Sequence, residues 1–181
     1  YSVLGVVIGL SPSVTTYTVG ENMYSDSMIS YDACPERLVD KVIVITGSTQ
    51  GIGLGMARRF SAEGASVVIN DHGANDGEVI AETVEEQEGG EVMYVLADAG
   101  DTDDLDRLVE ETVDEFGRID VLVNNVTNSV SGPFMERTEE EWDDVMDVAL
   151  KSFWYLTKQA LPHMPAGSSI INISSVHAVQ T

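Results

Sequence analysis

The sequence predicts an α/β fold in which a doubly wound parallel sheet lies between two layers of helices. Two observations carry this prediction. From residue 41 onward, short apolar runs alternate with amphipathic helical segments, and the first apolar run leads directly into a glycine-rich loop. Parallel strands need a helical crossover between them, so this alternation favours a parallel sheet with helices on both faces.

The first strand is expected at residues 42–45, which are four consecutive apolar residues, as in a strand buried on both faces. The loop that follows contains Gly47, Gly51 and Gly53. Gly47 permits a turn that a Cβ would obstruct, while Gly51 and Gly53 let backbone N–H groups and a helix N-terminus approach a pyrophosphate. The spacing differs from the common Gly-x-Gly-x-x-Gly pattern, so the neighbouring elements have to support the interpretation.

A helix from Ile52 to about Ala62, ended by Gly64, follows the loop. Its expected inward-facing residues are Ile52, Leu54, Met56, Ala57 and Phe60. The loop therefore joins a buried strand to an amphipathic helix, as a phosphate-binding turn requires.

The second strand, residues 66–70, ends at Asp71, which lies 18 residues after Gly53. This offset is close to the one at which a carboxylate accepts hydrogen bonds from an adenosine ribose. A 2′-phosphate there would meet a like charge, and the next residue is His72 rather than Arg, so we expect NAD rather than NADP. The alternative is that Asp71 is an ordinary turn residue at a strand end.

The remaining elements continue the alternation. We expect a helix over 76–88, a strand over 91–97, an acidic helix over 101–116, a strand over 119–124, a helix from about 139 to the Leu161-Pro162 break and a strand over 169–173. The apolar stripe of the acidic helix comprises Leu105, Leu108, Val109, Thr112, Val113 and Phe116. The Met and Trp residues are expected in the core.

The chain is strongly acidic, with 9 Lys and Arg against 31 Asp and Glu and a formal net charge of −22. Nucleic acids and anionic membranes would be repelled. The carboxylates follow the polar faces of predicted helices without metal-ligand clustering, so we interpret them as solvated surface and expect no metal site. Such an excess of acid resembles proteins of salt-accumulating halophiles, and stability that rises with KCl would test this hypothesis.

At 181 residues the chain can form one domain, with no apolar run long enough to span a membrane. Its single cysteine, Cys34, argues against a disulfide framework or a zinc cluster and favours a reducing, cytoplasmic location. We expect residues 1–37 to be an irregular extension and residues 38–181 to be the domain. Tyr1–Leu10 lacks the basic flank of a signal peptide. Because position 1 is not Met and Met28 shortly precedes the first strand, we expect either a natural start nearer Met23 or Met28, or a head that is the end of another segment.

Residues 38–181 resemble the short-chain dehydrogenase/reductase family, whose domain is a Rossmann fold. Residues 46–53 resemble its Thr-Gly-x-x-x-Gly-x-Gly loop, and residues 120–125 resemble the strand that ends in Asn-Asn-Ala-Gly. Asp98 follows the third strand, where the family has an Asp near the adenine ring. Residues 170–175 resemble the strand that delivers the catalytic serine, which is Ser175 here.

The resemblance implies hydride transfer between a nicotinamide and a secondary alcohol or ketone, by a family that usually forms homo-oligomers. In that chemistry a tyrosine exchanges the hydroxyl proton, a lysine lowers the tyrosine pKa, a serine binds the substrate oxygen and an asparagine holds a relay water. We expect Ser175 to be catalytic. The expected cofactor-binding residues are Gly47, Ser48, Gln50, Gly51, Ile52, Gly53, Asp71, Asp98 and Asn125.

The sequence departs from the family in three places. It contains no Tyr-x-x-x-Lys, since Tyr155 precedes Lys158 by three residues, and the family's pair would fall just beyond Thr181. We therefore expect a truncated piece, with an exposed sheet edge beside the last strand. Ala149 replaces the relay asparagine, and residues 126–127 are Val-Thr instead of Ala-Gly. The rival interpretation is a nucleotide-binding sensor or assembly subunit without redox turnover.

Overall fold

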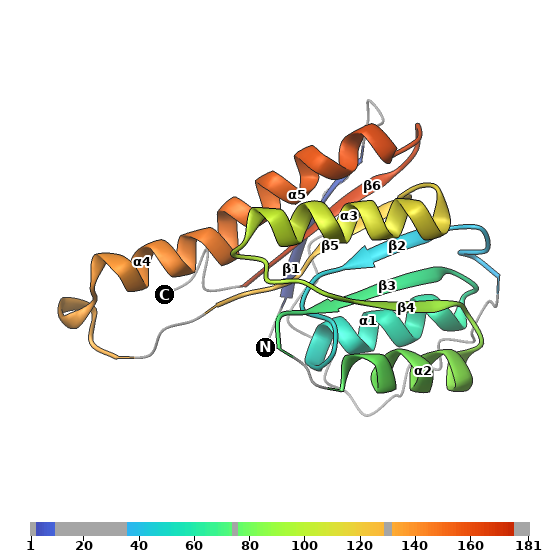
Figure 1. Ribbon diagram of the computed structural model, residues 1–181, viewed down its shortest axis with the longest axis horizontal. Coiled ribbons are helices and arrows are strands. Elements are labelled where there is room, and N and C mark those ends of the chain that lie inside the picture. The colour runs from blue at the N-terminus through green and yellow to red at the C-terminus, as the bar shows by residue number, and fades with distance from the viewer. Residues whose placement is uncertain (1–2, 10–35, 74–75, 129–131, 176–181) are drawn as a thin grey trace.

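The computed structural model describes residues 3–9, 36–73, 76–128 and 132–175 (Figure 1). Their strands form a six-stranded sheet in the order β1-β6-β5-β2-β3-β4. The strands are β1 (Val3–Gly9), β2 (Val42–Ile45), β3 (Ser66–Asp71), β4 (Val92–Leu96), β5 (Val121–Asn124) and β6 (Ser169–Ser175). All pairs from β6 to β4 are parallel, which confirms the predicted doubly wound sheet.

Helices cover both faces of this sheet, as expected (Figure 1). One layer contains α1 (Gly51–Ala62) and α2 (Gly77–Glu88), and the other contains α3 (Thr102–Phe116) and α5 (Ser152–Ala160). The helix expected from residue 139 to 161 is divided into α4 (Glu139–Met146), a π-helical turn η2 (Asp147–Lys151) and α5. Two 3₁₀ turns, η1 (Phe134–Glu136) and η3 (Leu161–His163), flank this rod.

The buried core has two parts because successive strand residues point to opposite faces. Ile43, Ile45, Val67 and Ile69 pack with Ala57, Ala81 and Val84 of α1 and α2. Val44, Val68 and Leu122 pack with Leu105 and Leu108 of α3 and with Leu156 of α5. The expected apolar stripe of α3 is confirmed, with Val113 and Phe116 partly buried at its end.

Three expectations about burial are wrong. Ile52 is 54% exposed because it lies in the first turn of α1, whereas Leu54, Met56 and Phe60 pack onto the core further along the helix. Trp142 and Trp154 are each 61% exposed. Met135, in η1, is 88% exposed.

The expectation that residues 1–37 are irregular is wrong for residues 3–9. Val3–Gly9 form β1, which pairs antiparallel with β6 along its whole length, from Val3 opposite Ser175 to Gly9 opposite Ser169. The exposed edge expected beside the last strand is therefore covered by β1. The proposed starts at Met23 and Met28 lie outside the described residues.

A buried carboxylate fastens the turn before β2 to the end of α1. Glu63 is 1% exposed and forms ion pairs with Arg37 and Arg59. The hydrogen bonds from Arg37, with those from Arg59, lower the pKa of Glu63 from 4.5 to about 2 despite its burial. Leu38 N–H donates to the Glu63 carbonyl at 2.9 Å, so backbone and side chain hold the same junction.

Candidate nucleotide-binding site

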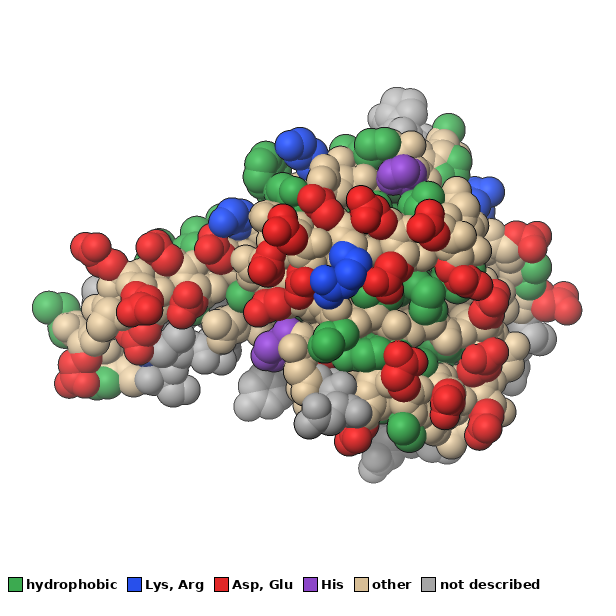
Figure 2. Space-filling model, in the orientation of Figure 1, with side chains coloured by type: hydrophobic (Ala, Val, Ile, Leu, Met, Phe, Trp, Pro, Cys, Tyr) green, Lys and Arg blue, Asp and Glu red, His purple; other side chains and the backbone are tan. Residues whose placement is uncertain are grey.

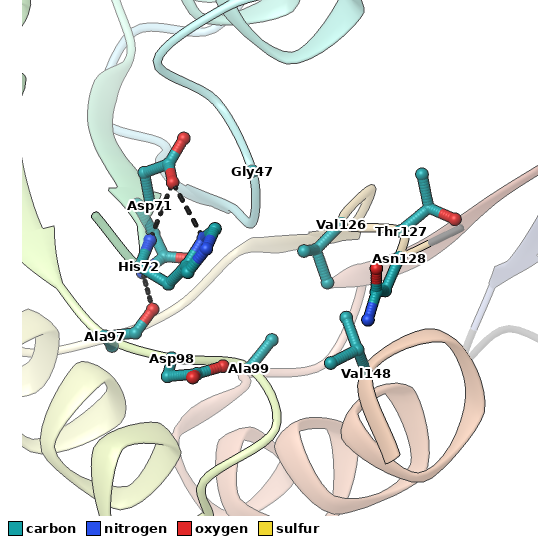
Figure 3. A pocket seen from close by; sticks show the side chains of 11 residues that line it. Gly47, Asp71, His72, Ala97, Asp98, Ala99, Val126, Thr127, Asn128 and Val148 are labelled. Carbon is teal, nitrogen blue, oxygen red and sulfur yellow. Dashed lines mark hydrogen bonds and ion pairs between the residues drawn. The ribbon is translucent and has the colours of Figure 1, made fainter. Parts of the chain in front are cut away.

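A cavity of about 180 Å³ opens at the carboxyl ends of the parallel strands. The strand order reverses between β2 and β5, and open α/β sheets bind ligands at this kind of position. Figure 3 shows Asp71 and His72 on one side of the cavity, Val126, Thr127 and Asn128 across from them, and Val148 entering from η2. The remaining lining residues are Gly47, Asn70, Ala97, Asp98 and Ala99.

The glycine loop between β2 and α1 has the conformation that the sequence predicted, for two different reasons. Gly47 and Gly51 have φ of +60° and +56°, which favours glycine at both positions. Gly53 instead avoids a collision, because a Cβ there would lie 2.4 Å from the Gly47 carbonyl oxygen and 2.7 Å from Ser48 Cα. The loop thus folds back onto the first turn of α1.

The N-terminus of α1 is open toward this edge of the sheet. Gln50 precedes the helix without a side-chain capping hydrogen bond, and the first turn contains no acidic residue. Gln50, Gly51 and Ile52 are exposed. The first N–H groups of a helix have no partner inside the helix and carry its partial positive charge, so this end can bind an anion such as a pyrophosphate.

Buried side chains hold the loop against β3. The Ser48 hydroxyl donates to the Ile45 carbonyl at 2.7 Å and accepts from Asn70 N–H at 2.9 Å. Ser48 is fully buried, so its expected contact with the cofactor is not available to its side chain, which acts within the protein. Asn70 Nδ2 continues the connection to β4 by donating to the carbonyls of Val95 at 3.1 Å and Ala97 at 2.9 Å.

A matching set of bonds holds the loop against β5. Asn125 Nδ2 donates to the carbonyl oxygens of Thr46 and Gly47, both at 2.9 Å. The Thr46 hydroxyl accepts from the N–H groups of Asn125 at 3.0 Å and Val126 at 3.1 Å. Asn125 therefore steadies the loop from behind, next to the cavity.

Asp71 presents a carboxylate at the end of β3. Its side chain is 14% exposed and lines the cavity. Oδ2 accepts a hydrogen bond from the Thr49 hydroxyl, while Oδ1 accepts from His72 N–H at 2.7 Å and contacts His72 Nδ1 at 3.1 Å. A carboxylate held here, beside a helix N-terminus, can accept hydrogen bonds from a ribose while the helix binds phosphate.

Asp98 lies at the far side of the cavity, after β4. Its carboxylate accepts from Gly100 N–H at 2.8 Å, and its own N–H donates to Asp104 Oδ2 at 2.8 Å. That bond, together with Arg107, lowers the pKa of Asp104. Asp101, Asp144 and Asp147 line an adjoining depression with Asp98, so this end of the site is strongly negative.

Carboxylates spread across the face of the molecule shown in Figure 2, with few Lys or Arg side chains among them. Within the described part of the chain, no group of three or more His, Cys, Asp or Glu side chains is arranged to hold a metal ion. No helix in that part is both long and apolar enough to cross a bilayer.

The structure does not bring the predicted catalytic residue into the cavity. Ser175 is exposed at the end of β6, opposite Val3 of β1, and it is absent from the cavity lining. Ala149 lies in η2 and lines a separate groove of about 450 Å³ with Trp154, Asn172 and others. Val126 and Thr127, the other departures from the family motif, do line the cavity.

Sequence reasoning missed several residues that shape the site. Thr49 and Asn70 fix the loop and the strand end, and Val148 reaches the cavity from η2. Asn70 carries the one signal that was available, because it is a polar residue that closes an apolar strand directly before Asp71. Nothing in the local pattern marks Thr49 or Val148.

Comparison with known proteins gives a consistent result. Residues 41–181 match the family model described as short chain dehydrogenase. The chain is 39% identical over 151 residues to 3beta-hydroxysteroid dehydrogenase 1 of Eggerthella lenta, and the match covers 80% of this chain and 56% of that protein. The chain thus spans about half the length of the curated relatives it matches.

Two solved structures illustrate the similarity of fold. L-sorbose reductase of Gluconobacter frateurii, complexed with NADPH and L-sorbose, superposes with a TM-score of 0.68 at 31% identity, over 70% of this chain and 48% of that one. The NADH-dependent reductase A1-R′, responsible for alginate metabolism, superposes with a TM-score of 0.64 at 35% identity, over 70% of this chain and 52% of that one.

Proposed function

The chain belongs to the short-chain dehydrogenase family of oxidoreductases, and on that premise we propose that it binds NAD at the cavity beside Asp71. The observation that carries the proposal is the pairing of the uncapped N-terminus of α1 with the Asp71 carboxylate at one edge of the sheet. The helix N-terminus suits a pyrophosphate and the Asp71 carboxylate suits a ribose, and a dinucleotide contains both groups.

Each described part of the site fits one part of the cofactor. Gly47, Gly51 and the first N–H groups of α1 would hold the pyrophosphate, and Asp71 would accept the adenosine ribose hydroxyls. Asp98 and Ala97 line the cavity where an adenine ring would lie, with the Asp98 carboxylate available as an acceptor. Ser48 and Asn125 act behind the loop, through the hydrogen bonds that fix its shape.

The charge of the cavity supports NAD over NADP. A 2′-phosphate would lie against Asp71, and His72 is the only His, Lys or Arg in the described lining. The relatives use both cofactors, since one is described as NADH-dependent and another is complexed with NADPH. The choice therefore depends on the residues of this chain.

The proposed reaction is hydride transfer between the nicotinamide and a secondary alcohol or ketone. The cofactor supplies or takes the hydride when bound, and Ser175 would donate a hydrogen bond to the substrate oxygen. Sorbose and steroid appear in the names of relatives, so a small alcohol or carbonyl compound is the proposed substrate class.

A second function, nucleotide binding without redox turnover, has one specific observation in its favour. Ala149 has no polar side-chain atom where the family has its relay asparagine. NADH oxidation followed at its absorbance band, with a panel of ketones, separates the two functions. Turnover supports the oxidoreductase, whereas tight binding without turnover supports the rival.

Cofactor binding itself is tested by calorimetric titration of the chain with NADH and with NADPH in concentrated KCl. We expect NADH to bind more tightly, and Asp71→Ala to remove most of that difference. Asp76→Ala, near the start of α2, is the matched control, since Asp76 is exposed and lies outside the cavity. No binding of either cofactor, or equal loss in both variants, would contradict the proposal.

We further propose that the protein is adapted to high salt, because its net charge of −22 favours unfolding through self-repulsion until ions screen it. The melting temperature should rise steeply with KCl concentration, and a salt-independent melting temperature would refute this. A cytoplasmic location and homo-oligomer formation remain predictions.

A further inference from the structure

The Asp71 carboxylate already has three hydrogen-bond donors among the described residues. Thr49 Oγ1 donates to Oδ2, whereas Oδ1 receives His72 N–H at 2.7 Å and lies 3.1 Å from His72 Nδ1. A carboxylate only accepts, so this contact is a hydrogen bond in the tautomer that carries the hydrogen on Nδ1. Two carboxylate oxygens offer about four acceptor sites in total, which leaves about one site for a ligand.

These three donors differ in how easily they can leave. Thr49 is 7% exposed and lies behind Asp71, outside the cavity lining. The N–H of His72 is fixed by the end of β3, where the Asp71 carbonyl is itself held by Ala97 N–H at 3.1 Å. The His72 ring is 71% exposed, lines the cavity and makes the longest of the three contacts (Figure 3).

We propose that the His72 ring occupies, in the free protein, an acceptor site on Asp71 that a ribose hydroxyl takes in the complex, and that Thr49 is the positioning residue that keeps the carboxylate oriented. This inference rests on the proposed function, in which Asp71 accepts the adenosine ribose. A ribose presents two neighbouring hydroxyl donors, and only one acceptor site is open to them. Binding of both hydroxyls requires the imidazole to swing away.

The proposal gives the two neighbours of Asp71 opposite effects on affinity. His72 competes with the cofactor, so its removal strengthens binding. Thr49 keeps the Asp71 carboxylate oriented for the ribose, so removal of the Thr49 hydroxyl weakens binding. Because Thr49 acts only through Asp71, its loss also reduces the preference for NADH over NADPH, whose phosphate gains nothing from that carboxylate.

The test is calorimetric titration of the chain and its variants with NADH and NADPH. His72→Ala should bind NADH about 2- to 5-fold more tightly, the range expected for loss of one weak, exposed contact. Thr49→Val should bind NADH roughly tenfold more weakly, as expected for a lost hydrogen bond to a charged group. Thr49→Ser, which keeps the hydroxyl, should restore both affinity and preference.

Two matched controls separate these effects from general ones. His163→Ala removes an exposed imidazole in η3, which is not part of the cavity lining. Thr83→Val removes a hydroxyl that donates to the Val79 carbonyl within α2, also away from the cavity. Both should bind NADH as the parent chain does.

Nitrogen-15 NMR of the imidazoles supplies a readout that needs no variant. The His72 ring should carry its hydrogen on Nδ1 in the free chain, and this resonance should shift on addition of NADH while His163 stays unchanged. If the parent chain binds no NADH, the proposed function fails and this inference fails with it. If the parent binds NADH but His72→Ala binds equally or more weakly, or the His72 resonance does not respond, only the competition by His72 is overturned.

Discussion

The two sides of the sheet's carboxyl edge differ in how their buried asparagine side chains are hydrogen-bonded. The cofactor edge, comprising residues 46–50, 70–72 and 125, has hydrogen bonds on the side chains of Thr46, Ser48, Asn70 and Asn125. In the β6 flank, comprising β6, η2 and α5, Asn172 Oδ1 accepts a hydrogen bond from Asn124 Nδ2 at 2.8 Å, whereas Asn124 Oδ1 is buried without a hydrogen-bond partner among the described residues. Trp154 of this flank is 61% exposed.

This difference separates the proposed cofactor site from the region where the family's catalytic residues would act. The proposed dinucleotide site is formed by the glycine loop and Asp71, and both are fixed by the connections of β2, β3, β4 and β5. The family's proton-transfer residues would act at the β6 flank, where Ala149 supplies no polar side-chain atom. Substitutions at the cofactor edge should therefore change folding and binding together, and those at the β6 flank should leave binding intact.

The largest effect is expected from Gly53→Ala at the cofactor edge. Its Cβ would lie 2.4 Å from the Gly47 carbonyl, so the loop has to shift. We expect destabilisation of about 1–3 kcal/mol in urea unfolding and loss of NADH binding in calorimetry. Gly55→Ala, two residues further along α1, is the control: a Cβ there meets nothing within 4 Å, and stability should rise by about 0.5–1 kcal/mol. Similar behaviour of the two variants would contradict the crowding argument.

The next largest effect on stability is expected from replacing one of two buried asparagines. Asn70→Leu removes the donor to two carbonyls, Val95 and Ala97, and should destabilise the chain by about 2 kcal/mol. Asn124→Leu removes a single hydrogen bond, from Nδ2 to Asn172 Oδ1 at 2.8 Å, and an oxygen that has no partner among the described residues, so its cost should be about 1 kcal/mol. Urea unfolding measures both, and a larger cost for Asn124→Leu would reverse the proposed ranking of the two regions.

Acid unfolding tests the junction that Glu63 forms between the turn before β2 and the end of α1. The folded-state pKa of Glu63 is about 2, below its ordinary value of 4.5, so the carboxylate stabilises the fold above pH 4.5. That contribution should be lost progressively as the pH falls from about 4.5 toward 2. Glu63→Gln should be less stable at neutral pH and show a weaker pH dependence in this interval. Thermal melting across the interval measures this, and parallel curves for variant and parent would disprove it.

The elements that were predicted correctly are those that follow from local sequence patterns. Strands β2 and β3 follow from apolar runs, and α3 follows from its apolar stripe and Gly117. The contacts that shape the site could not be predicted in this way. Thr49 meets Asp71 across 22 residues, and Asn70 meets Ala97 across 27, so both depend on strand register and loop conformation.

The errors have different physical origins. The pairing of β1 with β6 joins opposite ends of the described chain, and no local period encodes it. Trp142 belongs to α4, which extends past the end of the sheet and so has no strand beneath it (Figure 1). Trp154 lies in α5, which covers the sheet, and is exposed as well, so apolar residue type alone does not predict burial.

The smallest effect is expected from Ala149→Asn, which adds the family's amide to the β6 flank. Ala149 is half-buried in η2 and lines the groove with Asn172 and Ser174 rather than the cavity. The lower helix propensity of Asn should cost about 0.5 kcal/mol, and NADH affinity should change by less than about twofold, or about 0.4 kcal/mol.

The same substitution also tests whether the two regions are independent. Val148 precedes Ala149 and lines the cavity, so a shift of the π-helical turn would reach the cofactor. A tenfold change of NADH affinity in Ala149→Asn would therefore mean that η2 couples the β6 flank to the cofactor edge. Unchanged affinity would instead mean that a polar group can be added to the β6 flank without disturbing the proposed nucleotide site.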